Sequence, residues 1–216
     1  FFKFSYEIFK DKILAFFSLI VLESIYFYNY TSPEFNVNIS QLPFWALTIF
    51  YFWKGIKENK LLHWVFFGIF SALGFLSKYL FIYLLLSFFI FFIVNFKNYR
   101  KSLNGYILSV LISLTLLIPH FLWLFENNFI TIFYGLTRSG VTEFNYIDHF
   151  KNPIIFLIKQ FIILIPFFLM FYVVTKKFKY SINKKNIEII FLLSINLIPI
   201  ALILTTSIIM GAKIRT

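Results

Sequence analysis

The chain has 216 residues, of which 60% are hydrophobic and only 13% are charged, and its mean hydropathy is +0.83. Soluble domains carry about 25% charged residues, so this composition excludes a soluble domain and indicates a polytopic membrane protein. The net charge of +11 comes from short basic clusters, a pattern that favours the membrane surface over nucleic acid as the partner. There is no cysteine and no metal-ligand spacing, so we expect no disulfide, metal or cofactor.

Basic residues gather in four patches along the chain, and two apolar stretches lie between each patch and the next. Cytoplasmic loops carry the excess of Lys and Arg in membrane proteins, so the patches are predicted to face the cytoplasm and the polar breaks between them the outside. This orientation puts fourteen basic residues inside and five outside, with Lys159 within a span. The patches are Lys3/Lys10/Lys12, Lys54/Lys57/Lys60, Lys97/Arg100/Lys101 and Lys176/Lys177/Lys179/Lys184, with Lys185 directly behind.

The apolar stretches predict about seven membrane-spanning helices. A single helix over Leu61–Val94 would run about 50 Å, against a hydrocarbon core of about 30 Å, so we predict a hairpin with Lys78 at its outer tip. An outer loop is expected at Thr31–Gln41, and Glu126–Asn152 is expected to be a long polar outer segment. The predicted spans are Ile13–Tyr30, Leu42–Trp53, Leu61–Ser77, Tyr79–Val94, Gly105–Phe125, Pro153–Thr175 and Ile187–Met210.

Several residues near the predicted span ends have a structural interpretation. The four tryptophans are typical of interfacial anchors at the headgroup level, and His63 is expected to be structural. Lys159 lies about two turns into its span, where a buried lysine is a functional hypothesis and outward snorkelling is the alternative. The adjacent pair Asp148 and His149 does not by itself define a site. The tryptophans are Trp45, Trp53, Trp64 and Trp123.

The stretch Ile118–Gly140 concentrates site-capable residue types on the predicted outer face. It offers a possible proton carrier, a stacking surface for a sugar, carboxylate and amide hydrogen-bonding groups and a guanidinium that suits phosphate. The alternative is an interfacial loop with a tryptophan anchor and solvated charges. The residues concerned are Pro119, His120, Trp123, Glu126, Asn127, Asn128 and Arg138.

Lys78 is a lone charge in the sequence GFLSKY, Gly74–Tyr79. A lysine at an outer helix tip can bind the phosphate of a lipid carrier as a point charge. Alternatively, it snorkels to the headgroups.

Three blocks of the sequence resemble the polyprenyl-phosphate-sugar-dependent glycosyltransferases of the GT-C superfamily. They are NYTSPEFNVNISQLPFWALTIFYFWKGIKENK, GIFSALGFLSKYLFIYLLL and PHFLWLFENNFITIFYGLTRSG. The likeness is to the branch with protein O-mannosyltransferases, aminoarabinose transferases and rhizobial galacturonosyltransferase-like proteins. Gly68, Gly74, Leu76 and Lys78 are similar to that family's Gly-x-x-x-Gly-x-x-x-Leu-x-Lys pattern, with different spacing. Pro119, Trp123, Asn127, Asn128, Phe129 and Arg138 are similar to its Pro-x-x-x-Trp-Asn-like motif, and GAKIRT to the start of its next outer loop.

The resemblance implies an all-α polytopic helical bundle, with residues 1–216 as one membrane-embedded domain truncated at both ends and inactive alone. It implies a hexosyl- or pentosyltransferase that moves a sugar from a polyprenyl-phosphate carrier to a lipid, glycan or protein acceptor, as in protein glycosylation or lipopolysaccharide modification. The enzyme would lie in the inner membrane with its active face toward the periplasm or exterior. The catalytic acidic residue is expected upstream of Phe1. The residues expected to bind substrate or donor are Lys78, Tyr79, His120, Trp123, Glu126, Asn127 and Arg138.

Two other classes of protein compete with the glycosyltransferase. A multispan transporter or flippase for a lipid-linked sugar would place paired charges near the bilayer midplane at broken helices, whereas the charges here lie at predicted span ends. A non-catalytic membrane subunit would lack an acidic residue in the first outer loop of the full-length sequence.

Overall fold

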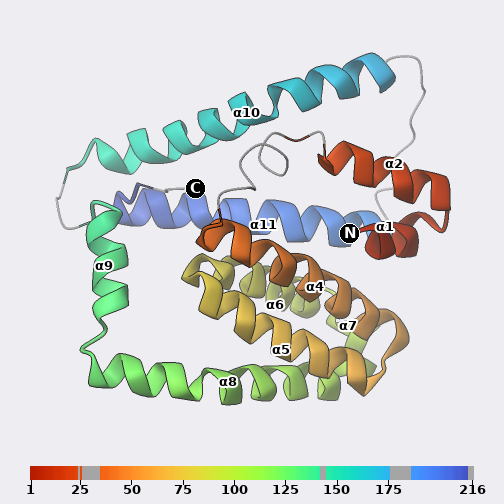
Figure 1. Cartoon of the computed structure of the whole chain (residues 1–216), viewed down its shortest axis with the longest axis horizontal. Helices are drawn as coiled ribbons and strands as arrows, with labels where there is room; N and C mark the ends of the chain where they lie inside the picture. Colours follow the sequence, from red (N-terminus) through yellow and green to blue (C-terminus); the bar gives the residue numbers. More distant parts are fainter. Residues whose placement is uncertain (24, 26–34, 142–144, 176–185, 214–216) are drawn as a thin grey trace.

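The computed structural model describes residues 1–23, 25, 35–141, 145–175 and 186–213, and every regular element in these ranges is a helix (Figure 1). The predicted all-α class is therefore confirmed. The longer helices are α2 (Lys12–Glu23), α4 (Val37–Glu58), α5 (Leu61–Ser77), α6 (Ile82–Val94), α8 (Leu103–Glu126), α10 (Asp148–Thr175) and α11 (Ile187–Met210). The shorter ones are α1 (Phe2–Phe9), α7 (Phe96–Tyr99), α9 (Ile130–Arg138) and the 3-10 turns η1 (Tyr79–Phe81) and η2 (Arg100–Ser102).

Three helical stretches of the described chain are long and apolar enough to cross a bilayer, namely Phe96–Glu126, Asp148–Leu169 and Ile187–Met210. The apolar stretches Leu61–Ser77 and Tyr79–Val94 are shorter. These findings agree with a helical membrane protein, while the seven-span count stays a prediction. Residues 24 and 26–30 of the predicted first span, and the whole fourth basic patch, lie outside the described residues.

The predicted break at Lys78 is present, and the chain reverses there. Lys78 has extended backbone dihedrals between the end of α5 and the start of η1. The ring of Phe81 packs so closely on Gly74 that a Cβ there would overlap it. Farther from the tip, Phe67 of α5 meets Phe88 of α6 with ring centroids 5.3 Å apart. These contacts hold α5 and α6 together as a helical hairpin.

One predicted loop boundary was wrong. The outer loop assigned to Thr31–Gln41 ends earlier, because α4 begins at Val37 and the side chain of Asn36 accepts hydrogen bonds from the backbone N–H groups of Asn38 and Ile39. Such an N-cap satisfies amide groups that have no partner within the helix. The outer segment predicted at Glu126–Asn152 contains α9 and the first turn of α10.

The helices alternate in direction, so the bundle has two ends (Figure 1). The Lys78 end holds the start of α4, the α5–α6 tip, the end of α8, α9 and the end of α11. At the Glu58 end, α4 finishes and α5, α8 and α11 begin. Polar contacts join the elements at each end, such as Lys78 to Asn38 and Lys57 to Glu188. The alternation agrees with the predicted pairing of spans and places the predicted outer residues together.

Aromatic side chains fill the centre of the bundle between α4, α5, α6, α8 and α11. Phe52 is fully buried, and its ring stacks on Phe88 at 4.5 Å and on Phe191 at 5.9 Å. Helices approach closely where residues are small: a Cβ on Gly68 would lie 2.6 Å from the carbonyl oxygen of Ser109. Close approach through small residues drives helix association in lipid, where the hydrophobic effect between helices is absent.

Two tryptophans expected at the headgroup level belong instead to this core. Trp53 and Trp64 are 2% and 0% exposed, respectively. Trp64 packs against Gly55 and Gly105, where any side chain would overlap its indole ring. The interfacial interpretation was therefore wrong for both: the Trp64 ring fills the space left by glycines on α4 and α8, and the Trp53 ring stacks on Phe191 of α11 at 4.8 Å. Trp123 is 42% exposed and Trp45 is half-buried.

The remaining residues singled out in the sequence make structural contacts or are exposed. The Nε2 atom of His63 lies 3.0 Å from Glu58 Oε2, in agreement with a structural role. Lys159 is exposed on α10 and does not point into the bundle, which leaves the snorkelling alternative. His149 contacts the carbonyl oxygen of Ile208 through Nδ1 at 2.6 Å, and so helps to hold α10 against α11.

The lysine patch at the end of α4 is neutralised by carboxylates. Lys54 Nζ lies 2.6 Å from Glu58 Oε1, Lys60 Nζ 2.9 Å from Glu58 Oε2, and Lys57 Nζ 2.8 Å from Glu188 Oε1. The hydrogen bond from Lys54, helped by that from Lys60, holds the pKa of the Glu58 carboxyl well below its usual range. This network joins α4 to the starts of α5 and α11.

Candidate functional site

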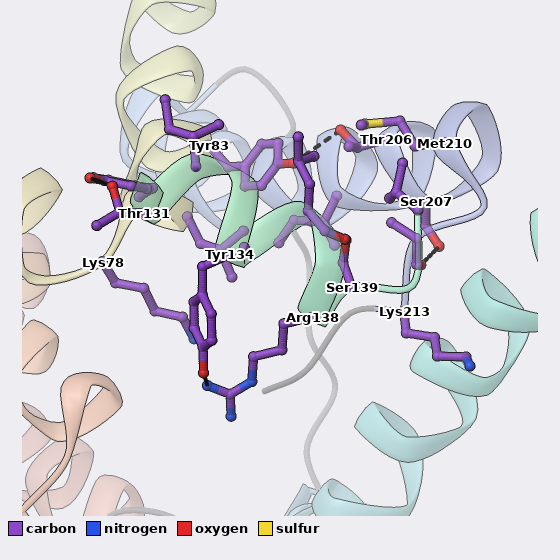
Figure 2. Close-up of a pocket in the computed structure, with 18 of the residues that line it drawn as sticks. Lys78, Tyr83, Thr131, Tyr134, Arg138, Ser139, Thr206, Ser207, Met210 and Lys213 are labelled. Carbon is purple, nitrogen blue, oxygen red and sulfur yellow. Dashed lines mark hydrogen bonds between the residues drawn. The ribbon is translucent and has the colours of Figure 1, made fainter. Parts of the chain in front are cut away.

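A cavity of about 530 Å³ lies at the Lys78 end, between the α5–α6 tip, α9 and the end of α11 (Figure 2). Its size is within the range of about 300–1,000 Å³ that is usual for small-molecule sites. Three basic residues, Lys78, Arg138 and Lys213, line it. Apolar side chains form much of the remaining wall, among them Leu80, Leu136 and others from α4 and α11.

Lys78 enters this pocket from the break between α5 and η1. Its Nζ atom donates a hydrogen bond of 2.5 Å to Oδ1 of Asn38, in the first turn of α4. Burial, and secondarily the charge of Arg138, lower the pKa of the Lys78 ammonium from its ordinary value of 10.5. Two cations that destabilise each other in this way favour the binding of an anion between them.

Arg138 comes from the last turn of α9, and the chain reaches this position through an unusual turn. Asn128 and Phe129 both have left-handed backbone dihedrals, with φ of 50° and 56°. Non-glycine residues rarely adopt this conformation, and it occurs preferentially at functional sites. The turn sets α9 across the ends of the longer helices (Figure 1). As a result, Arg138 faces the same pocket as Lys78.

The guanidinium of Arg138 is positioned by a tyrosine one turn earlier in α9. Arg138 Nη1 lies 3.4 Å from the hydroxyl oxygen of Tyr134, and its Cζ lies 6.0 Å from the centroid of the Tyr134 ring. Figure 2 shows the side chains of Lys78, Tyr134 and Arg138 reaching toward the same side of the pocket. The two cationic groups thus converge on one space.

A part-buried hydrogen-bonded chain ties α9 to η1 and α8. The hydroxyl of Tyr79 lies 2.8 Å from His120 Nε2 and 2.8 Å from Thr131 Oγ1. The His120 ring stacks on Trp123, with centroids 6.2 Å apart and planes 15° apart. Tyr79 therefore fixes the first turn of α9 relative to the α5–α6 tip, and His120 and Trp123 support it from behind.

The end of α11 closes the opposite side of the pocket. The hydroxyl of Tyr83 donates to Thr206 Oγ1 at 3.1 Å, which joins α6 to α11. The backbone N–H of Lys213 donates to the carbonyl oxygen of Ser139 at 2.8 Å, so the chain after α11 lies against the end of α9. Lys213 therefore lines the pocket, and Figure 2 shows its side chain directed away from Lys78 and Arg138.

The seven residues expected to bind substrate do not all meet. Lys78, Tyr79 and Arg138 line the pocket, and His120 and Trp123 lie directly behind Tyr79. Glu126 and Asn127 are exposed at the end of α8 outside it, and Asn127 Nδ2 donates to the carbonyl oxygen of Trp123 as part of the helix end. Sequence reasoning missed several lining residues. They are Asn38, Tyr83, Thr131, Tyr134, Thr206 and Lys213.

The chemistry of this pocket suits an anion attached to an apolar chain. Among the described residues that line it, three are basic and none is acidic. Within the described ranges, no carboxylate lies within ion-pair distance of Lys78, Arg138 or Lys213. Guanidinium and ammonium groups are the usual protein ligands of phosphate. Apolar residues next to these cations offer a wall for a lipid chain.

Comparison with known families gives one match. Residues 2–123 match the model of the family described as dolichyl-phosphate-mannose-protein mannosyltransferase. The matched part covers α1 to nearly the end of α8 and includes Lys78, Tyr79, His120 and Trp123, whereas α9 with Arg138 follows it. No curated protein and no solved structure matched the chain.

Proposed function

The chain belongs to the dolichyl-phosphate-mannose-protein mannosyltransferase family, and from this premise we propose that its pocket at the Lys78 end binds the phosphate of a polyprenyl-phosphate sugar donor. Membership in this family implies glycosyltransferase activity with such a donor. The proposal adds that Lys78 and Arg138 hold the phosphate. It also adds that transfer takes place on the outer side of the inner membrane.

The observation that carries this proposal is the convergence of Lys78 and Arg138 on a pocket with no acidic residue among its described lining. The lysines at the end of α4, in contrast, are paired with glutamates. The Lys78–Arg138 pair instead raises its own electrostatic energy, which a bound phosphate would relieve. The apolar wall beside the pair suits the lipid part of the carrier.

Sugar transfer makes this arrangement useful for catalysis as well as for binding. An acceptor hydroxyl loses its proton to a general base, its oxygen bonds to the anomeric carbon, and the bond from that carbon to the phosphate oxygen breaks. The carrier phosphate thereby changes from a diester with one negative charge to a monoester with more negative charge. Cations fixed beside it stabilise the transition state more than the bound donor, which is the requirement for catalysis.

The general base is proposed to be an acidic residue that is not among the described residues lining the pocket. His120, Trp123, Glu126 and Asn127 are proposed to contact the sugar or acceptor, with Trp123 as a stacking surface. The acceptor is a lipid, glycan or protein, and the sugar a hexose or pentose. Residues 1–216 are proposed to form the central part of a single catalytic membrane domain.

Sugar transfer by an Arg138→Ala variant of the full-length protein tests this function. The assay uses a purified polyprenyl-phosphate sugar donor and protein with normal membrane insertion. Loss of a preorganised electrostatic partner typically lowers turnover about 10²–10³-fold, whereas a solvated arginine contributes only about 0–1 kcal/mol. Lys151→Ala, an exposed cation near the start of α10, is the matched control and is expected to be active. A loss below about threefold for Arg138→Ala would remove this arginine from the site.

A further inference from the structure

A second concave surface lies at the opposite end of the bundle, between the last turns of α6 and the first turns of α8. It has a volume of about 290 Å³, and all its lining residues are hydrophobic or aromatic. Phe92 and Tyr106 form its floor, with their rings stacked at 4.7 Å and 9°. The rim is open: Ile93, Ile107 and Leu111 are 53%, 48% and 57% exposed, respectively. The groove extends along about 12 Å of α8, from Leu103 to Leu111.

The chain that closes this groove carries an unneutralised basic cluster. Lys97, Arg100 and Lys101 lie on α7 and η2, between the groove residues Phe96 and Leu103. All three are exposed, and in the described part of the chain no carboxylate lies within ion-pair distance of them. Figure 1 shows α7 beside the beginning of α8, so the cluster lies at the end of the groove.

The basic patch at the end of α4, which lies at the same end of the bundle, differs because its lysines are paired with carboxylates. Lys54, Lys57 and Lys60 each have a glutamate partner between 2.6 and 2.9 Å away. A general excess of positive charge would leave both patches unpaired, but only the patch at the groove lacks carboxylates. The charge of this patch is therefore available for a ligand beside the apolar groove.

We propose that the groove and the basic turn together bind one anionic phospholipid. The lipid phosphate contacts Lys97, Arg100 and Lys101, and an acyl chain lies in the groove against Phe92 and Tyr106. Basic pockets between membrane helices bind anionic headgroups, with about 1 kcal/mol of attraction per Lys or Arg near the surface. This site lies at the end opposite to the donor pocket and does not depend on the glycosyltransferase proposal.

The test is the retention of phosphatidylglycerol over phosphatidylcholine by the purified full-length protein, measured by native mass spectrometry. Lys97→Gln/Lys101→Gln is expected to lower the preference on the order of tenfold. The matched control Lys3→Gln/Lys12→Gln removes two exposed lysines at the same end but away from the groove. This variant is expected to keep the preference for phosphatidylglycerol. Thermal unfolding of each variant in detergent confirms that it is folded.

A second pair of variants tests the groove without changing charge. Val110→Trp, at a groove position 41% exposed, is expected to displace the acyl chain and abolish the preference. Leu114→Trp, one turn farther along α8 and 50% exposed, is expected to leave it unchanged. An equal loss of the phosphatidylglycerol preference in both double-lysine variants would overturn the proposal. Full retention of that preference by Val110→Trp would also overturn it. Displacement of the phospholipid by polyprenyl phosphate would overturn the proposal as well, because it identifies the carrier as the occupant of the groove. A change of oligomeric state without bound phospholipid would overturn it too, because it identifies a second copy of the chain as the occupant.

Discussion

Lys78 and Asn38 are forty residues apart in the chain, and a hydrogen bond of 2.5 Å joins the lysine Nζ to the amide oxygen. The bond brings the first turn of α4 to the break between α5 and α6. It aims the ammonium into a pocket that Arg138 enters from α9. A single side-chain contact therefore joins two segments that are distant in the sequence at the proposed phosphate site.

The stability of the bundle is expected to depend on the close packing of α5 on α8. A Cβ on Gly68 would lie 2.6 Å from the carbonyl oxygen of Ser109, and backbone atoms cannot move away as a flexible side chain can. We expect Gly68→Ala to destabilise the protein by about 1–3 kcal/mol, as overpacking typically does. The measurement is thermal unfolding of the purified protein in detergent.

Gly135 of α9 is the control for this prediction, because a Cβ there would have no atom within 4 Å. Gly135→Ala is expected to be neutral or slightly stabilising, since alanine favours helix more than glycine does. Similar losses of stability in both variants would show that α5 and α8 are not held at the separation seen here.

Tyr79 is expected to hold α9 in place through its bonds to His120 and Thr131. Tyr79→Phe leaves both partners without the shared hydroxyl, so hydrogen exchange in residues 130–138 should become faster. Tyr83→Phe is the matched control, because its hydroxyl bonds to Thr206 of α11 and not to α9. If exchange in α9 is unchanged by Tyr79→Phe, or responds equally to both variants, Tyr79 does not anchor this helix.

The orientation of the bundle can be measured with single cysteines, since the chain has none of its own. Glu126 is exposed at the Lys78 end and Asn98 is exposed at the Glu58 end. In intact cells, a membrane-impermeant thiol reagent is expected to label Glu126→Cys and not Asn98→Cys, because basic segments remain in the cytoplasm. The reverse pattern would place the pocket on the cytoplasmic side.

The lengths of the apolar stretches and the placement of charge predicted much of this architecture but not the geometry of the site. The bounds predicted for Leu61–Ser77 and Ile187–Met210 coincide with α5 and α11, because long apolar runs between charges leave few alternatives. Residues 130–138 mix apolar and polar side chains, and the position of their helix depends on a left-handed turn at Asn128 and Phe129. No pattern in the sequence predicts this turn. The contact of Asn38 with Lys78 arises only when α4 and α5 pack together.

Donor binding is expected to depend on pH through Lys78. Burial and the neighbouring Arg138 lower the pKa of this ammonium, so the free protein loses the charge at a lower pH than an ordinary lysine does. Affinity for a polyprenyl-phosphate donor should be constant below that pKa and fall as pH rises through it, by at most about tenfold per pH unit for one proton.

Lys78→Arg is the control, because a guanidinium does not titrate in this range and part of the affinity is expected to remain. Tyr134 and Lys213 also line the pocket, but they are present in both proteins. Parallel pH profiles for the wild type and Lys78→Arg would assign the pH dependence to another group.

Equilibrium binding of a polyprenyl-phosphate sugar donor to the full-length protein in nanodiscs tests the role of Lys78 most directly. A hydrogen bond to a charged group contributes about 1.5–3 kcal/mol, so Lys78→Ala is expected to weaken binding by at least about tenfold. Lys151→Ala, which removes an exposed lysine outside the pocket, should bind as the wild type does. If folded Lys78→Ala binds the donor as tightly as the wild type, the lysine is only a headgroup anchor and the pocket does not hold the carrier phosphate as proposed.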